Sequence, residues 1–230
     1  MKKHHISAAD ELFFGEGKKS ESINGRRGVP ITPISKVNLG SPAALSATGI
    51  AAAQAVGGAV NLTINGSLAS GGVATNAVPR GVSVVSANVA DTSQTATFYG
   101  TDVYGVPVVE TLTLNGTTTV AGKKAFKTIT RVAMSATTAG TVSAGVTDIL
   151  GLPYKLTAKS DLISTWFNQI VEATLPTIVV ADTNTATATT GDVRGTIDLH
   201  SALNGSAVSV YMVAYPSSEE STFGVAQYGG

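Results

Sequence analysis

The amino-acid sequence predicts an all-β protein: two small β-sandwich or barrel-like domains preceded by an extended N-terminal arm. Three observations favour this fold class. Only 13% of the residues are charged, and Thr, Ser, Ala, Gly and Asn replace the Glu, Lys and Leu that helices use. Runs rich in Val, Ile and Thr recur about every ten residues, as in sandwiches and barrels. Asn-Gly pairs separate several runs, and this dipeptide is a strong hairpin signal.

The arm is predicted to span residues 1–40. Residues 1–36 carry seven basic and four acidic side chains, whereas the formal net charge of the whole chain is zero. Its prolines favour extended backbone. A basic arm on a slightly acidic body suits docking onto an acidic neighbour, and the alternative is a solvated tail. The candidate contact residues of the arm are Phe13, Phe14, Arg26 and Arg27.

The first domain is predicted to span residues 41–154. Residues 41–56 fit no helical face, so strand or irregular structure is expected there. Asn65-Gly66 and Asn115-Gly116 are expected to be tight hairpin connections, because both residue types tolerate a positive φ. Further strands are predicted at residues 60–64, 82–86, 95–99, 106–114, 124–134 and 141–146.

The second domain is predicted to span residues 155–230 and has one ambiguous segment, residues 161–173. Leu162, Trp166 and Ile170 are spaced four apart, which favours a helix. A turn at Asn168-Gln169 would instead make a strand pair, and the β-rich surroundings favour this alternative. Strands are predicted at residues 176–181, 193–199 and 208–215, with a hairpin at Asn204-Gly205.

Composition argues against several classes of partner. A zero net charge lacks the basic excess of a nucleic-acid binder, so no direct nucleic-acid contact is expected. The chain contains no run of about 18 apolar residues, so no membrane helix is expected. Its basic start is not followed by the apolar stretch of a secretory signal. Without cysteine, disulfides and thiolate metal sites are excluded. We therefore expect synthesis in a cytoplasm and no membrane partner.

No motif for catalysis, for a metal or for a cofactor emerges from the residue pattern. Asp192 and Arg194 flank Val193 in a predicted strand, so their side chains share a face. They are placed to pair with each other, and the interpretations are a surface pair, which is the commoner case, or a pair that fixes the register of subunits. His200 follows Asp198, and the least favoured hypothesis is a hydrolase that uses Asp192, Asp198 and His200. The pattern indicates instead a structural or binding protein without an enzyme's active site.

Four blocks of the chain resemble virion structural proteins of tailed bacteriophages. The first block is GTDVYGVPVVET at residues 100–111, continued by KAFKTI at residues 124–129. The others are ATATTGDVRGT at residues 186–196, PRGV at residues 79–82 and ILGLP at residues 149–153. The resemblance as a whole extends over roughly residues 43–215, and the order of the blocks along one chain carries it.

The resemblance implies a capsid decoration (cement) protein on the exterior of the phage head, with the major capsid protein as its partner. It implies no enzyme activity and no cofactor. The alternative is a tail, neck or spike protein, including a receptor-binding module whose exposed Tyr and Asn contact glycans.

A homotrimer is expected, because association covers strand edges and apolar faces that a monomer leaves exposed. The contacts are predicted to come mainly from the second domain, around Trp166, Phe167 and the strand at residues 208–215. Trp166 is the preferred anchor, since large aromatics dominate interface energetics. The competing interpretation is that Trp166 is part of the core of residues 155–230.

Overall fold

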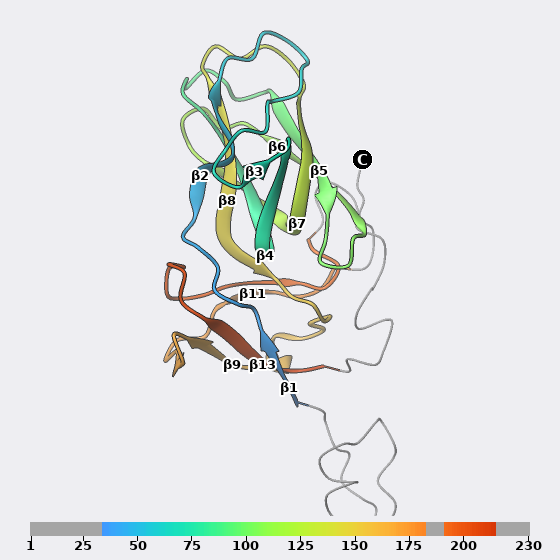
Figure 1. The fold of residues 1–230 in the computed structure, drawn as a ribbon, viewed down its shortest axis with the longest axis vertical. Coiled ribbons are helices and arrows are strands. Elements are labelled where there is room, and N and C mark those ends of the chain that lie inside the picture. Colours follow the sequence, from blue (N-terminus) through green and yellow to red (C-terminus); the bar gives the residue numbers. More distant parts are fainter. Residues whose placement is uncertain (1–33, 183–190, 215–230) are drawn as a thin grey trace, which may run out of the picture.

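The computed structural model describes residues 34–182 and 191–214 of the chain (Figure 1). The prediction of an all-β fold is confirmed, because apart from one short 3₁₀ turn at Lys159–Asp161 every regular element is a strand. All strand pairs are antiparallel.

The larger sheet has nine strands in the order β11-β12-β8-β4-β7-β5-β6, with β2 beside β8 and β3 beside β4. Its strands are β2 (Ser46–Gln54), β3 (Ala69–Ser70), β4 (Val73–Ser86), β5 (Thr95–Thr101), β6 (Pro107–Thr113), β7 (Val120–Met134), β8 (Val142–Gly151), β11 (Thr177–Val179) and β12 (Thr196–Asp198).

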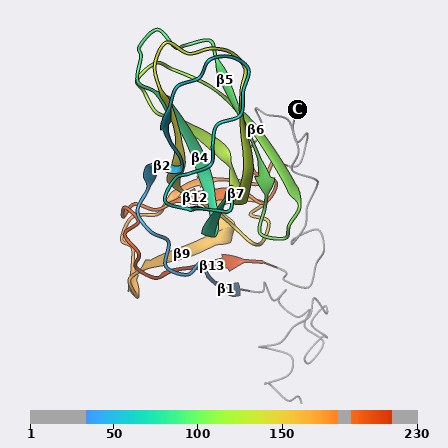
Figure 2. The same ribbon diagram turned by 45° about the horizontal axis from the view of Figure 1, so that its top comes forward.

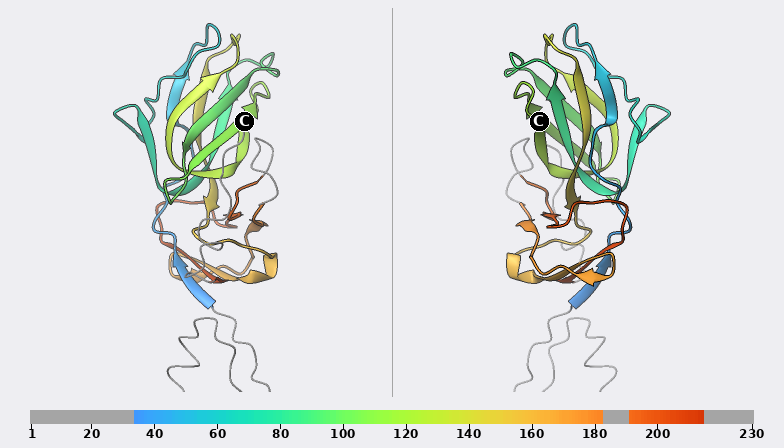
Figure 3. Two further views of the ribbon diagram at one scale, coloured as in Figure 1. Left: turned by 90° about the vertical axis from the view of Figure 1, so that its right-hand side faces the viewer. Right: turned by 90° about the vertical axis from the view of Figure 1, so that its left-hand side faces the viewer.

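The smaller sheet has four strands in the order β1-β13-β9-β10. They are β1 (Ile34–Asn38), β9 (Leu162–Phe167), β10 (Ile170–Val171) and β13 (Val208–Val213). This sheet lies at one end of the molecule, across the ends of the long strands of the larger sheet (Figures 2 and 3). Alternate residues of β13 are buried, as expected for a strand with one face on a core.

Two hydrophobic cores lie along the molecule, and β8 contributes to both. Val142, Ala144 and Val146 belong to the first core, around Phe98 and Phe126. Leu150, at the other end of β8, belongs to the second core, which packs under the smaller sheet. The change of core along β8 falls close to the predicted boundary at residue 154, although the division into domains as such stays a prediction.

The segment 34–40, predicted as part of the arm, is instead integrated into the fold. Here β1 pairs along its whole length with β13, and Val37 and Leu39 are buried in the second core. The sequence did not reveal this pairing because five residues beside two prolines carry little periodicity, and their partner strand lies far along the chain. The rest of the predicted arm, residues 1–33, lies outside the described residues.

None of the three Asn-Gly pairs connects two neighbouring strands of a sheet, so the predicted strand pairings were wrong. Asn115-Gly116 does make a tight turn, in which the Thr118 N–H donates to the carbonyl oxygen of Asn115 at 3.1 Å. Gly116 does adopt a positive φ of 58°, but β5 lies between the strands that flank this turn. Gly205 also has a positive φ, of 90°, yet it connects β12 with β13, which belong to different sheets. Gly66 is needed because its backbone lies directly against that of Thr48 and Gly49.

The ambiguous segment 161–173 forms a strand pair and not a helix. Phe167 pairs with Ile170 across a two-residue turn. Both turn residues are left-handed, with φ of 49° at Asn168 and 64° at Gln169, the combination that a type I′ hairpin requires. The prediction that Asn168-Gln169 is the turn is confirmed.

Candidate functional site: a buried ionic junction and an outer aromatic face

Five charged side chains meet in the interior where the two cores adjoin, and we call this group the ionic junction. Each is at most 2% exposed. They come from the β5–β6 turn, from β6, from β7 and from the segment before β12, and they are Asp102, Glu110, Lys124, Asp192 and Arg194.

Asp102 is positioned by its own turn and binds Arg194. The backbone N–H groups of Tyr104 and Val106 donate to Asp102 Oδ1 at 2.8 and 2.9 Å. Gly105, with a φ of 78°, allows the turn to close. Asp102 Oδ2 then accepts a hydrogen bond from Arg194 Nη2 at 2.5 Å. The β5–β6 turn is thereby tied to the segment before β12.

The Arg194 guanidinium makes further contacts that fix the orientation of its planar group. Its Nε donates to the carbonyl oxygen of Leu152 at 3.2 Å, and it lies 5.2 Å from the centroid of the Tyr104 ring. The Tyr104 hydroxyl donates to the carbonyl oxygen of Pro153 at 2.7 Å. The Arg194 side chain is thus bound by two segments that are distant from it in sequence, the β5–β6 turn and the segment at Leu152.

Asp192 links the same segment to β7. Its Oδ2 accepts from the Ala125 N–H at 3.1 Å, and its Oδ1 accepts from the Arg194 N–H at 2.9 Å. The predicted pairing between the side chains of Asp192 and Arg194 was therefore wrong. Arg194 pairs with Asp102, and both members lie in the interior because the tertiary fold, not strand alternation, brings them together.

Glu110 and Lys124 complete the junction. Glu110 Oε1 accepts from the Lys123 N–H at 2.5 Å, and Oε2 accepts from the Lys124 N–H at 3.2 Å. Gly122 permits this approach, because a Cβ there would collide with the Glu110 carboxylate. Lys124 Nζ donates to the carbonyl oxygen of Val109 at 3.0 Å.

Burial changes the acidity of both groups. It raises the pKa of Glu110 to about 7, although the backbone N–H groups of Lys123 and Lys124 and the Lys124 ammonium act in the opposite direction. Burial also lowers the pKa of Lys124, while the charges of Glu110 and Asp192 oppose that change. A shifted pKa of this kind occurs at functional sites and in structural ion networks alike.

The blocks that carry the phage resemblance converge on this junction. Asp102 and Glu110 belong to the first block, Lys124 to its continuation, and Asp192 and Arg194 to the block at residues 186–196. The ILGLP block supplies the carbonyl oxygen of Leu152 to Arg194. The residue pattern alone gave no signal for the junction, since its members are up to about ninety positions apart and share no period.

The PRGV block forms a second ionic contact, between β4 and β8. Arg80 Nη2 lies 3.1 Å from Asp148 Oδ1, and Arg80 Nη1 donates to the carbonyl oxygen of Ala43 at 2.8 Å. Arg80 Nε donates to the carbonyl oxygen of Thr147 at 2.8 Å. This arginine is 4% exposed, so its role here is to join buried backbone segments.

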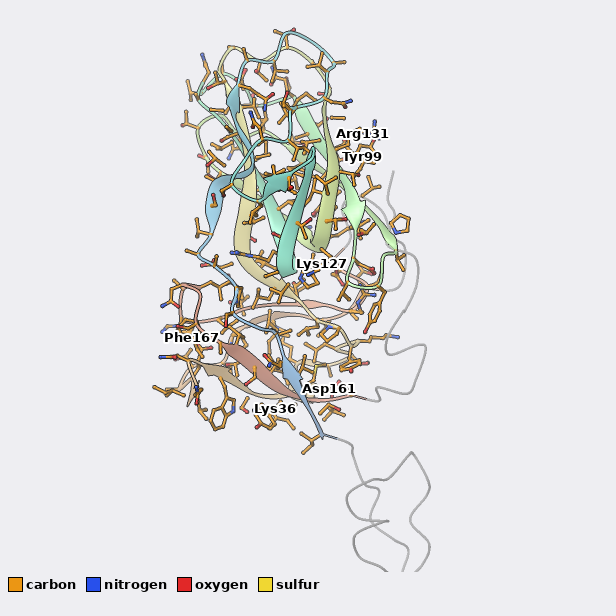
Figure 4. All side chains as sticks on the ribbon, viewed as in Figure 1. Lys36, Tyr99, Lys127, Arg131, Asp161 and Phe167 are labelled. Atoms are coloured by element: carbon orange, nitrogen blue, oxygen red, sulfur yellow. The ribbon has the colours of Figure 1, made fainter. Side chains whose placement is uncertain are left out.

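The two described anchor candidates, Trp166 and Phe167, lie at the end of β9 with different surroundings. Phe167 packs against the second core. Trp166 is half-buried and lies outside the residues of that core, with its ring 5.9 Å from the ring of Tyr211. Lys36 Nζ lies 5.7 Å from the Tyr211 centroid. We call the surface around Trp166, Tyr211 and Lys36 the outer aromatic face; Figure 4 shows Lys36 on this sheet, far from Arg131.

The remaining anchor candidates, Phe13, Phe14, Arg26 and Arg27, lie outside the described residues. Of the residues in the hydrolase hypothesis, Asp192 is engaged in the junction and His200 is exposed at the end of β12. Among residues 34–182 and 191–214, no group of three or more acidic or histidine side chains is placed to hold a metal ion. No helix in these ranges is long and apolar enough to cross a membrane.

Comparison of the chain with protein-family models, with curated proteins and with solved structures finds no match. The fold and the junction define an all-β protein whose two cores are joined by buried charges.

Proposed function

We propose that this chain is a structural protein of a tailed-phage virion that decorates the capsid exterior and stabilises the assembled shell. Its partner is the major capsid protein, and it is made in the host cytoplasm. The proposal assigns it neither an enzymatic activity nor a cofactor. The observation that carries the proposal is that the separate blocks resembling virion proteins supply the five charges of one buried junction.

The junction supports this function through specificity of packing. Buried ion pairs contribute little net stability, but the loss of one partner leaves an uncompensated charge, so the arrangement favours one mutual position of the joined segments. A protein that clamps neighbouring capsomers needs such a defined shape. Because it binds only the assembled shell, it shifts the equilibrium toward that state.

A binding assay with shells tests the proposal. The full chain is added to expanded phage shells that lack it, and bound protein is separated by sedimentation. We expect saturable binding and a higher temperature of shell disruption. Shells that neither bind the chain nor gain thermal stability would contradict the decoration role.

Copy number distinguishes decoration from the alternative tail, neck or spike location. Quantitative mass spectrometry of whole virions should find hundreds of copies of the chain per particle if it covers the head. A count of a few to some dozens would assign the chain to the tail, neck or spike instead.

A further inference from the structure

The outer aromatic face contains a groove of about 290 Å³. It lies over the smaller sheet, between β1, β13, the end of β9 and the Asn168-Gln169 turn. The groove is lined by Lys36, Asn38, Trp166, Gln169, Ser209 and Tyr211, with Ala207 and Val208 beside them. The volume is close to the lower end of small-ligand sites, about 300 Å³.

Two aromatic rings form the apolar part of the groove. The rings of Trp166 and Tyr211 are half-buried, 5.9 Å apart and inclined at 48°. The indole N–H of Trp166 donates to Ser164 Oγ at 3.3 Å, which leaves its rings for apolar contact. Such rings present flat apolar area whose shape changes little on binding, and the C–H groups on one face of a sugar ring match such a surface.

The polar groups of the groove are two neutral amides and two hydroxyls beside one ammonium. Asn38 Oδ1 accepts from the Gly40 N–H at 2.8 Å. The NH₂ group of Asn38 is not used in this bond and can donate to a ligand. The side chains of Gln169 and Ser209 make no hydrogen bond to another described residue. An amide both donates and accepts, which is what a ligand rich in hydroxyl groups requires.

Gln169 occupies a backbone position that its residue type disfavours. Its φ of 64° is the conformation that type I′ turns usually give to glycine, and a side chain with a Cβ costs about 1 kcal/mol there. The turn itself therefore does not call for glutamine. The side chain of Gln169 instead lines the groove, and retained local strain of this kind is found at ligand sites.

We propose that this groove is a saccharide-binding site that takes one sugar ring, packed on Trp166 and Tyr211 and hydrogen-bonded by Asn38 and Gln169. The site goes beyond capsid decoration and does not depend on it, because every residue that lines the groove belongs to the free chain. A virion protein with this site would attach its particle to glycans.

Trp166 is the only tryptophan of the chain, so its fluorescence reports occupation of the groove directly. The full chain is titrated with hexoses, N-acetylhexosamines, N-acetylneuraminic acid and their oligosaccharides. We expect a saturable change in emission with at least one saccharide, and none with glycerol at equal concentration. A flat titration with every saccharide would overturn the proposal.

Gln169→Gly separates binding from folding. Glycine relieves the turn, so the thermal midpoint should stay equal or rise, while saccharide affinity should fall about tenfold through loss of the amide. The matched control is Ile163→Ala on β9, an exposed side chain outside the groove, which should bind as the unmodified chain does. Unchanged affinity in Gln169→Gly would refute the site. An emission change on raising protein concentration alone would assign the groove to a second copy of the chain instead.

Discussion

Glu110 occupies a position on β6 that the strand pattern reserves for an apolar side chain. Val108 and Leu112 flank it on the same buried face. A carboxylate is tolerated there because the Lys123 and Lys124 N–H groups donate to it and the Lys124 ammonium is close. A charge in a core is costly unless it is paired and hydrogen-bonded, so these partners explain why β6 forms although it buries a glutamate.

Stability should fall as pH rises through the range in which Glu110 titrates. Its pKa is about 7 in the folded chain against 4.5 ordinarily, so folding favours the protonated form. The stabilising contribution of Glu110 is fully present below about pH 4.5 and is lost as pH rises through 7, by about 3 kcal/mol at most. Glu110→Gln, which mimics the protonated acid, should therefore be the more stable chain at pH 8.

Denaturant unfolding at several pH values between 4.5 and 8 measures this difference. The matched control is Asp161→Asn, the same carboxylate-to-amide change in the 3₁₀ turn, at a residue that is not part of the junction (Figure 4). If Glu110→Gln has the same pH dependence as the unmodified chain, Glu110 does not take up the proton.

Arg194→Met should be strongly destabilising, because it leaves Asp102 buried without its cation. Removal of one partner from a buried pair costs about 3–5 kcal/mol. Asp102→Asn in the same chain should restore part of this loss, since the neutral amide no longer needs a counter-charge. Chemical denaturation of both single variants and the double variant gives the coupling energy. Additive losses would show that the two side chains do not interact.

The preference of turn residues for a positive φ determined the backbone conformation of the turns but not which strands pair across them. Gly116 has the left-handed φ that an Asn-Gly pair favours, yet its flanking strands are separated by β5. Asn168-Gln169, a weaker turn signal, connects two strands that do pair. Pairing therefore depends on which strand faces find a common core, and a dipeptide carries no information on that choice.

Gly116→Ala should cost more than Gly71→Ala, although both positions have a φ near 60°. A Cβ at Gly116 would lie 2.7 Å from the carbonyl oxygen of Val89, whereas a Cβ at Gly71 meets nothing within 4 Å. Both variants pay about 1 kcal/mol of backbone strain, and only Gly116→Ala adds a steric clash. Thermal unfolding of the two variants measures the difference, and equal midpoints would contradict it.

The two hydrophobic cores are connected by one continuous strand and by the ionic junction. β8 passes from the first core to the second, and the segment before β12 is bound to the β5–β6 turn and to β7. The smaller sheet is left with one face on the second core and the outer aromatic face on the other side. Exposed apolar residues rim that face, among them Ile34, Ile163 and Val171, and such clustering marks an interaction surface.

Self-association tests the predicted homotrimer. Light scattering on the purified chain should give three times the 23.2 kDa chain mass at micromolar concentration. Trp166 cannot anchor this contact and hold a sugar ring at the same time, so the two predictions exclude each other. If Trp166 anchors the trimer, Trp166→Ala should release subunits before it affects unfolding, because the side chain lies outside the second core, and the saccharide site would then be wrong. A monomer at these concentrations counts against a preformed trimer, and unfolding without prior dissociation counts against the anchor.

From its own pattern the sequence determined the all-β class, most strands of the larger sheet and the turn at Asn168-Gln169. These depend on alternation and on residue preferences for φ, which act within a few residues. Only the tertiary structure decided that β1 joins the second core, that β5 separates β6 from β7, and that Asp102 meets Arg194. Those contacts join residues that are far apart along the chain, and they form because burial and charge pairing are satisfied in three dimensions at once. The groove beside Trp166 has the same origin, since β1 lies more than a hundred residues along the chain from β9 and β13.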